Sequence, residues 1–115
     1  DHDTAFAAVS HLPHLLAFAL MNSITAQKQG QNYLALAGTG FRDFSRIAAS
    51  EPKMWHDILL ANRIQMQEQL NHFKQALQNL ETMIADSDSK ALEAALTAAS
   101  QARAHWHMTS AKHKK

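Results

Sequence analysis

Hydrophobic residues recur along this chain with the period of an α-helix. The clearest case lies within residues 63–85, where apolar residues alternate at spacings of four and three, as in an a/d seam. The seam consists of Met66, Leu70, Phe73, Leu77, Leu80 and Ile84. It predicts the longest helix of the protein. Because few charges surround the seam, we expect this helix to pair with a second copy of the chain.

Shorter helices are predicted on both sides of the seam, separated by glycine-containing or polar breaks. They are expected at about 4–26, 31–37, 43–49, 54–60 and 90–107. Pro13 removes one backbone hydrogen bond, which predicts a kink near Val9. Ser50 is expected to cap the helix that follows it, and Gly38 to adopt the left-handed conformation after a helix. The predicted fold class is all-α, a helical bundle that forms one domain over residues 1–115.

Composition agrees with a helical protein and argues against several functions. Hydrophobic residues make up 46% of the 115 residues, and the net charge is +1, which gives no electrostatic basis for binding nucleic acid or an anionic membrane. The apolar run from Leu12 to Met21 is too short to span a bilayer, so we expect no membrane partner. No cysteine is present to form a disulfide or a thiolate metal site. The first residue is not methionine, so we expect a piece of a longer protein.

Two polar segments interrupt the helical pattern, and the first is Ser10-His11-Leu12-Pro13-His14. His11 and His14 are three residues apart and therefore share one face of a helix. They could bind zinc with further ligands, pack inside the bundle, or recognise a polar ligand. The further zinc ligands would come from Asp3, His56, Asp57 or His72. Nothing in the spacing specifies a metal site, and recognition of a polar ligand is the favoured interpretation.

The second polar segment runs from Gly38 to Ser50, where a glycine turn leads into a stretch with two arginines. Its glycines lack the lysine and the preceding strand that a nucleotide-binding loop requires. Arg42 and Arg46 are four residues apart on one helical face, and arginine binds carboxylates through paired N–H donors. The segment therefore forms a site for an anionic small molecule, or else two solvated arginines paired with Asp43 or Glu51.

These segments, in this order, resemble the C-terminal domain of prephenate dehydrogenase. The matching stretches are His2-Asp3, Ser10 through His14, Gly38 through Ser50, Trp55, and Ile58 through Arg63. The resemblance implies a two-domain enzyme of the 6-phosphogluconate-dehydrogenase-like kind. In such an enzyme an N-terminal nucleotide-binding domain, which is absent from this chain, precedes a helical dimerization domain. It also implies a cytoplasmic enzyme of tyrosine biosynthesis.

The implied reaction is oxidative decarboxylation of prephenate to 4-hydroxyphenylpyruvate, with hydride passed to NAD or NADP. Some relatives, the arogenate or cyclohexadienyl dehydrogenases, use arogenate instead. The catalytic base and the cofactor site would lie mainly in the missing domain, so we expect no turnover by this chain alone. The implied partners are a second copy of the chain, prephenate or arogenate, and tyrosine as a feedback inhibitor. The alternative is a helical dimerization module without a ligand.

The resemblance also assigns roles to individual positions. Arg46 matches the arginine that holds a substrate carboxylate, and His14 matches a histidine near the substrate side chain. The Thr39-Gly40 loop matches backbone that lines the same pocket, while Asp3 and Trp55 match positions at the pocket mouth. The complete set of expected substrate-binding residues is Asp3, His11, His14, Thr39, Gly40, Arg46 and Trp55.

Overall fold

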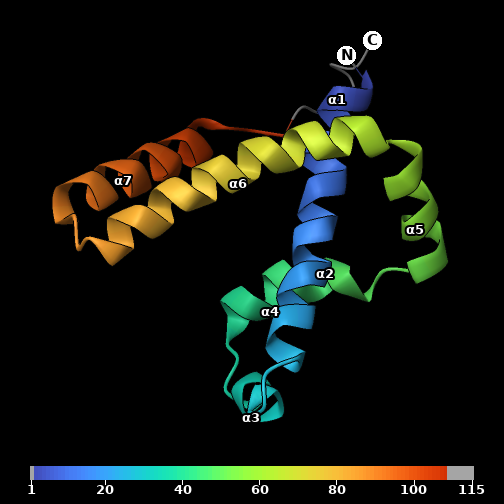
Figure 1. Ribbon diagram of the computed structural model, residues 1–115, viewed down its shortest axis with the longest axis horizontal. Coiled ribbons are helices and arrows are strands. Elements are labelled where there is room, and N and C mark those ends of the chain that lie inside the picture. The colour runs from blue at the N-terminus through green and yellow to red at the C-terminus, as the bar shows by residue number, and fades with distance from the viewer. Residues whose placement is uncertain (1, 109–115) are drawn as a thin grey trace. The chain divides into compact units, whose positions relative to one another are not determined.

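The computed structural model describes residues 2–108, and every regular element in that range is helical. In chain order (Figure 1), these are α1 His2–Phe6, a π-helical turn Ala7–His11, α2 Leu12–Thr25, α3 Gly30–Ala35, α4 Thr39–Ser45, a 3-10 turn Arg46–Ala49, α5 Pro52–Ala61, α6 Arg63–Ala85 and α7 Ser89–His105. The prediction of an all-α fold is confirmed. The chain divides into two compact units, Asp1–Phe73 and Lys74–Lys115, and α6 contributes a half to each.

The first helical stretch contains a π-turn where the sequence predicts a kink. Proline at position 13 has no N–H and cannot continue the regular hydrogen-bond pattern of an α-helix. Just before it, the N–H of Leu12 donates to the carbonyl oxygen of Ala7, five residues back instead of four. The interruption expected near Val9 is therefore present as one wide turn, and the helix continues on both sides of it.

The continuous stretch His2–Thr25 is 24 residues long, with a mean hydropathy of 1.5 in its most apolar window. By length and composition alone it could cross a membrane, whereas the prediction from the sequence concerned only the run from Leu12 to Met21, which by itself is too short to span a bilayer. The π-turn keeps the helix continuous ahead of Pro13, so this run is part of a longer helical stretch. A core helix of a soluble protein or a signal sequence meets the same two criteria, so they are weak evidence for a membrane span.

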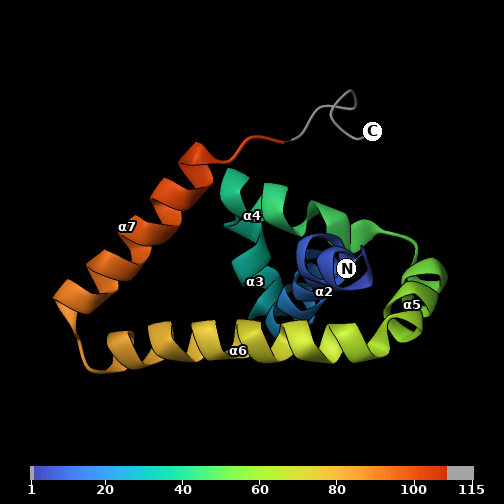
Figure 2. The same ribbon diagram turned by 90° about the horizontal axis from the view of Figure 1, so that it is seen from above.

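The core of the first unit lies where the first turns of α6 pack against the π-turn and the start of α2. The buried side chains of Ala7, Leu12 and Met66 meet there. Partly buried residues packed against them are Leu15, Leu16, Leu59, Leu70 and Phe73. Figure 2 looks nearly along α2 and shows α4 on one side of it and the first half of α6 on the other. The first three residues of the predicted seam are thus covered by their own chain.

Two local predictions about turns and caps were wrong. Gly38 has φ −105° and ψ −164°, an extended conformation at the start of α4, and not the left-handed conformation after a helix. Ser50 does not cap α5, because its hydroxyl donates to the carbonyl oxygen of Ile47. Glu51 is the cap instead, and its carboxylate accepts a hydrogen bond from the Met54 N–H at 2.7 Å.

The second unit consists of the remainder of α6 and α7, joined by a tight turn. Ser87 takes a positive φ of 51° in this turn, and the Asp88 carboxylate accepts from the N–H of Ala91 at 3.2 Å to cap α7. An open groove of about 870 Å³ lies between the two helices, and its apolar lining consists of Met83, Ile84, Leu92 and Leu96. No residue described in this unit is buried.

Candidate functional site

An aromatic cluster forms where the π-turn and α2 meet α5. The imidazole of His14 stacks on the indole of Trp55, with ring centroids 3.8 Å apart and planes inclined by 15°. The ring of His11 meets the same indole edge-on, at 5.9 Å and 79°. Trp55 is buried and both imidazoles are half-buried. The fold therefore brings together three of the predicted site residues from two separate segments.

Local structure determines where these rings lie. Trp55 is in the first turns of α5, whose start is held by the Glu51 cap and by a proline in its first turn. His11 is the last residue of the π-turn, and His14 follows in the first turn of α2. Because a π-turn holds one residue more than an α-helical turn, it determines which face of the helix carries the imidazoles.

Hydrogen bonds restrain both imidazoles. Nδ1 of His14 donates to the carbonyl oxygen of Ser10 at 3.0 Å. The buried Asn62, which lies between α5 and α6, donates from Nδ2 to the carbonyl oxygen of Asp3 at 2.8 Å. The same Nδ2 lies 3.4 Å from Nδ1 of His11. Asp3 thus takes part through its main chain, while its side chain is exposed.

Asn62 is absent from the predicted site residues. Its only signal in the sequence is its place in the stretch Ile58 through Arg63, which contributes to the resemblance. Its role depends on contacts with residues more than fifty positions earlier in the chain. No local pattern predicts such contacts.

Arg46 lies at the start of the 3-10 turn, beside a later part of α2. It lines an open groove of about 670 Å³ together with Phe18, Met21 and Asn22 of that helix. His14 does not line this groove. Phe18 is four residues after His14, so the two lie on one face of α2 about one turn apart. Arg46 and the aromatic cluster therefore border neighbouring stretches of the same helix face.

The two arginines of this segment differ in their partners. Nε of Arg42 donates to Oδ1 of Asp43 at 3.1 Å, in an ion pair on the surface. Within residues 2–108, Arg46 forms no ion pair, so its guanidinium is available to an anion. Thr39 and Gly40 open α4 and are exposed, and neither lines the groove. Of the two open interpretations of this segment, pairing with Asp43 thus applies to Arg42 alone.

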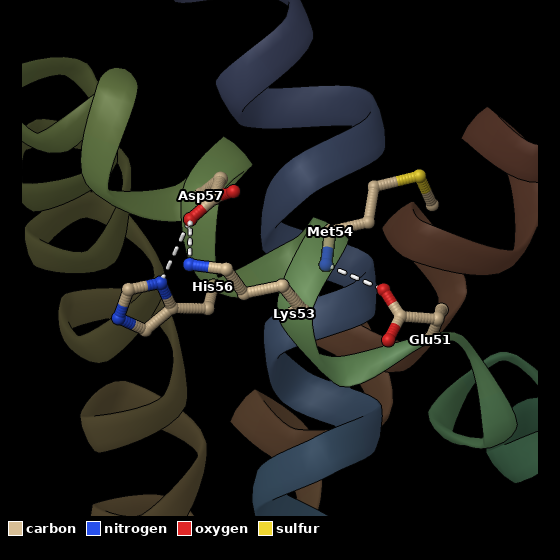
Figure 3. Close-up of polar contacts among 5 residues, drawn as sticks. All are labelled: Glu51, Lys53, Met54, His56 and Asp57. Atoms are coloured by element: carbon tan, nitrogen blue, oxygen red, sulfur yellow. Dashed lines mark hydrogen bonds and ion pairs between the residues drawn. The ribbon is translucent and has the colours of Figure 1, made fainter.

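A second polar cluster lies on the exposed face of α5 (Figure 3). Oδ1 of Asp57 accepts from Nζ of Lys53 at 3.3 Å and lies 3.0 Å from Nδ1 of His56. The hydrogen bond to His56, and next that from Lys53, lowers the pKa of Asp57 below its ordinary value. All three side chains are more than half exposed, as expected for a solvated surface network. In the described part of the chain, no three His, Asp or Glu side chains are grouped to hold a metal ion.

Known proteins share both the sequence and the fold. The chain is 38% identical over 89 residues to cyclohexadienyl dehydrogenase of Zymomonas mobilis, covering 76% of this chain and 30% of that protein. The crystal structure of Synechocystis arogenate dehydrogenase matches with a TM-score of 0.84 at 30% identity, covering 90% of this chain and 38% of that one. Prephenate dehydrogenase from Aquifex aeolicus, in complex with hydroxyphenyl propionate and NAD+, matches with a TM-score of 0.83 at 35% identity, covering 89% and 36%.

The chain spans about a third of the length of these relatives, as the coverages of 30%, 38% and 36% show. Residues 1–98 match the family model described as prephenate dehydrogenase, dimerization domain. This match includes every predicted site residue and both halves of α6. The chain therefore belongs to the prephenate dehydrogenase dimerization-domain family.

Proposed function

We propose that this chain is the dimerization and substrate-binding domain of a cytoplasmic prephenate dehydrogenase of tyrosine biosynthesis. In the whole protein, an N-terminal domain would bind NAD or NADP and supply the catalytic base. Family membership supports this class of reaction. The Aquifex aeolicus relative, whose crystal holds both hydroxyphenyl propionate and NAD+, supports a ligand with an aromatic ring and a carboxylate.

The reaction divides naturally between the two domains. The base of the other domain would remove the proton of the ring hydroxyl, and NAD or NADP would accept hydride from the carbon that carries this hydroxyl. The ring carboxylate would then leave as CO₂, and return of the proton to the phenolate oxygen would give 4-hydroxyphenylpyruvate. The residues of this chain bind and orient the substrate for these steps. Fixing the reacting atoms at the right separation lowers the barrier without any bond being made to the domain itself.

The observation that carries the proposal is that Arg46, which forms no ion pair within residues 2–108, lines a groove with Phe18, one turn of α2 beyond the His14 that stacks on Trp55. Prephenate is a dianion, and a guanidinium binds a carboxylate through two parallel N–H donors. The aromatic rings offer an apolar surface against which a six-membered ring can pack. Asp3, His11, Thr39 and Gly40 stay predictions as further substrate contacts, as does tyrosine as a feedback inhibitor.

Homodimerization is part of the same proposal, with the surface formed by the second half of α6 and by α7. Leu77, Ile84 and Leu96 are each more than half exposed in a single copy of the chain. They continue a seam whose first half is already covered within the chain. The family description as a dimerization domain supports a second copy as the partner that covers them.

The test of substrate binding uses the full-length enzyme that contains this domain, with Arg46→Ala and the matched control Arg42→Ala. Losing an unreplaced charge-assisted contact costs about 2–4 kcal/mol, so kcat/KM for prephenate should fall roughly thirty- to a thousand-fold in Arg46→Ala. Arg42→Ala should stay within about two-fold, because Arg42 is paired with Asp43 on the surface. The KM for NAD should not change in either variant.

Equal kinetics in the two variants would remove the role given to Arg46. They would leave the ligand-free dimerization module as the better account of this chain. Turnover by this chain alone would also contradict the proposal, because the catalytic base is assigned to the other domain.

A further inference from the structure

We propose that Asn62 and the carbonyl group of Ser10 hold His11 and His14 in opposite tautomers. The pair then presents one N–H donor and one lone-pair acceptor to a bound ligand. The ligand in this inference rests on the proposed function. The tautomers themselves depend only on contacts within this chain.

The tautomer of His14 follows from its contact with Ser10. A carbonyl oxygen can only accept, so the 3.0 Å hydrogen bond places the proton of the imidazole on Nδ1. A neutral imidazole carries a single ring proton, so Nε2 of His14 has a free lone pair. Stacking on Trp55 at 3.8 Å restrains the plane of the ring and therefore the direction of that lone pair.

The tautomer of His11 follows from the orientation of the Asn62 amide. Only the NH₂ group of the amide can donate to the carbonyl oxygen of Asp3, at 2.8 Å, and this contact identifies Nδ2. The same nitrogen faces Nδ1 of His11 at 3.4 Å, so Nδ1 accepts and the ring proton lies on Nε2. Asn62 is 8% exposed, so a lost hydrogen bond at this position is poorly replaced by water.

With opposite tautomers, the two imidazoles offer a ligand one hydrogen-bond donor and one acceptor, whereas two identical tautomers would offer two of the same kind. Nε2–H of His11 can bind a carboxylate or carbonyl oxygen, whereas Nε2 of His14 can accept from a hydroxyl or another N–H or O–H donor. The ligand class is therefore a small molecule with a donor and an acceptor at separate positions. Asn62 acts on this ligand only through His11, which makes it a positioning residue.

The tautomers can be measured without substrate, in this chain labelled with ¹⁵N. Correlation of ring protons with ring nitrogens by NMR at about pH 8, where an ordinary imidazole is neutral, distinguishes the two forms. The expected result is Nε2–H for His11 and Nδ1–H for His14. Free histidine favours the Nε2–H form, so only the Nδ1–H form expected for His14 departs from the intrinsic preference. The His14 signal is therefore the decisive one. An Nε2–H form at His14 in the wild-type chain would overturn the proposal without any variant.

Asn62→Asp tests the lock on His11, because it replaces a donor by an acceptor of nearly the same shape. The ring proton of His11 should move from Nε2 to Nδ1, while His14 should keep its form. Asn71→Asp is the matched control, since it makes the same chemical change at an exposed position of α6 and should move neither proton. A His11 that keeps Nε2–H in folded Asn62→Asp contradicts the role of Asn62.

The link to the ligand is tested separately in the full-length enzyme. Asn62→Asp should raise KM for prephenate roughly ten-fold, the equivalent of one misplaced hydrogen bond, while Asn71→Asp should not change it. An unchanged KM together with a moved proton would overturn the ligand contact and leave the tautomers standing. Failure of the substrate function as a whole would instead appear as equal kinetics of Arg46→Ala and Arg42→Ala.

Discussion

The two halves of α6 carry the same hydrophobic pattern and have different surroundings. In the first half, Met66 is only 5% exposed, and Leu70 and Phe73 pack against the core that it forms with Leu12. In the second half, Leu77 is 53% and Ile84 is 65% exposed. A heptad pattern therefore indicates that a helix face will be covered, but it does not indicate what covers it.

The difference arises from what each half meets within its own unit. The first half of α6 meets the π-turn and α2, which supply Ala7 and Leu12 from the beginning of the chain. Among the described residues of the second unit, the second half of α6 meets α7, whose Leu92 and Leu96 line an open groove instead of closing a core. These two helices leave the seam residues of the second half open to solvent, so this half would need a further partner to reach the burial of the first.

The largest effect is expected in the covered half of α6. Met66→Ala leaves a cavity in the core and should lower the free energy of unfolding by about 2–4 kcal/mol, measured by urea denaturation. The matched control is Met54→Ala on α5, whose side chain is 51% exposed and should cost less than about 0.5 kcal/mol. Similar losses in the two variants would show that the first half is no better covered than an exposed position.

A smaller effect, on association instead of folding, is expected in the exposed half. Ile84→Lys places an unpaired charge in the proposed dimer surface and should raise the dimer dissociation constant roughly ten- to thirty-fold, about 1.4–2 kcal/mol, by analytical ultracentrifugation. Gln78→Lys, an exposed position of α6 outside the seam, is the control with the same new charge. If both variants dissociate equally, or if the wild-type chain stays monomeric at micromolar concentration, the exposed half is not the dimer surface.

The smallest effect concerns the cap that starts α7. Asp88→Ala removes the acceptor for the Ala91 N–H and should destabilise the helix by about 1 kcal/mol. Faster hydrogen exchange of the Ala91 amide would report this change. Asp86→Ala, at an exposed position in the same turn, is the control and should leave this exchange unchanged. Because none of residues 74–108 is buried, we expect local interactions such as this cap to matter more for stability in the second unit than in the first.

Helix positions were largely predictable from the sequence, because they depend on local periodicity and breaks. The longest helix has the predicted bounds, Arg63–Ala85, and the predicted break at Asn62 is present. Caps were less predictable, since Ser50 and Glu51 are both suitable acceptors and only the path of the chain decides between them. Gly38 shows the same limit, because glycine tolerates the extended conformation as well as the left-handed one.

The candidate site was predictable only in part. Family resemblance predicted substrate contacts at His14, Trp55 and Arg46, but their spacing in sequence did not show that His14 and Trp55 stack or that Arg46 lines a separate groove. In the sequence, Asn62 is a polar residue at a predicted helix break, and the break alone is enough to explain an asparagine at this position. The role proposed for it depends on its hydrogen bond to the carbonyl group of Asp3, a contact between distant parts of the chain.

The π-turn at Ala7–His11 has a consequence for how relatives of this protein are compared. One additional residue in a helix advances every preceding side chain by about 100° around the axis. A relative with one residue fewer between positions 7 and 11 would present a different face before the turn and the same face after it. An alignment that closes this gap elsewhere would equate Asp3 with a residue on another side of the helix. An insertion or deletion at this turn therefore rotates the side chains before it about the helix axis relative to those after it. A percentage of identical residues does not detect this rotation.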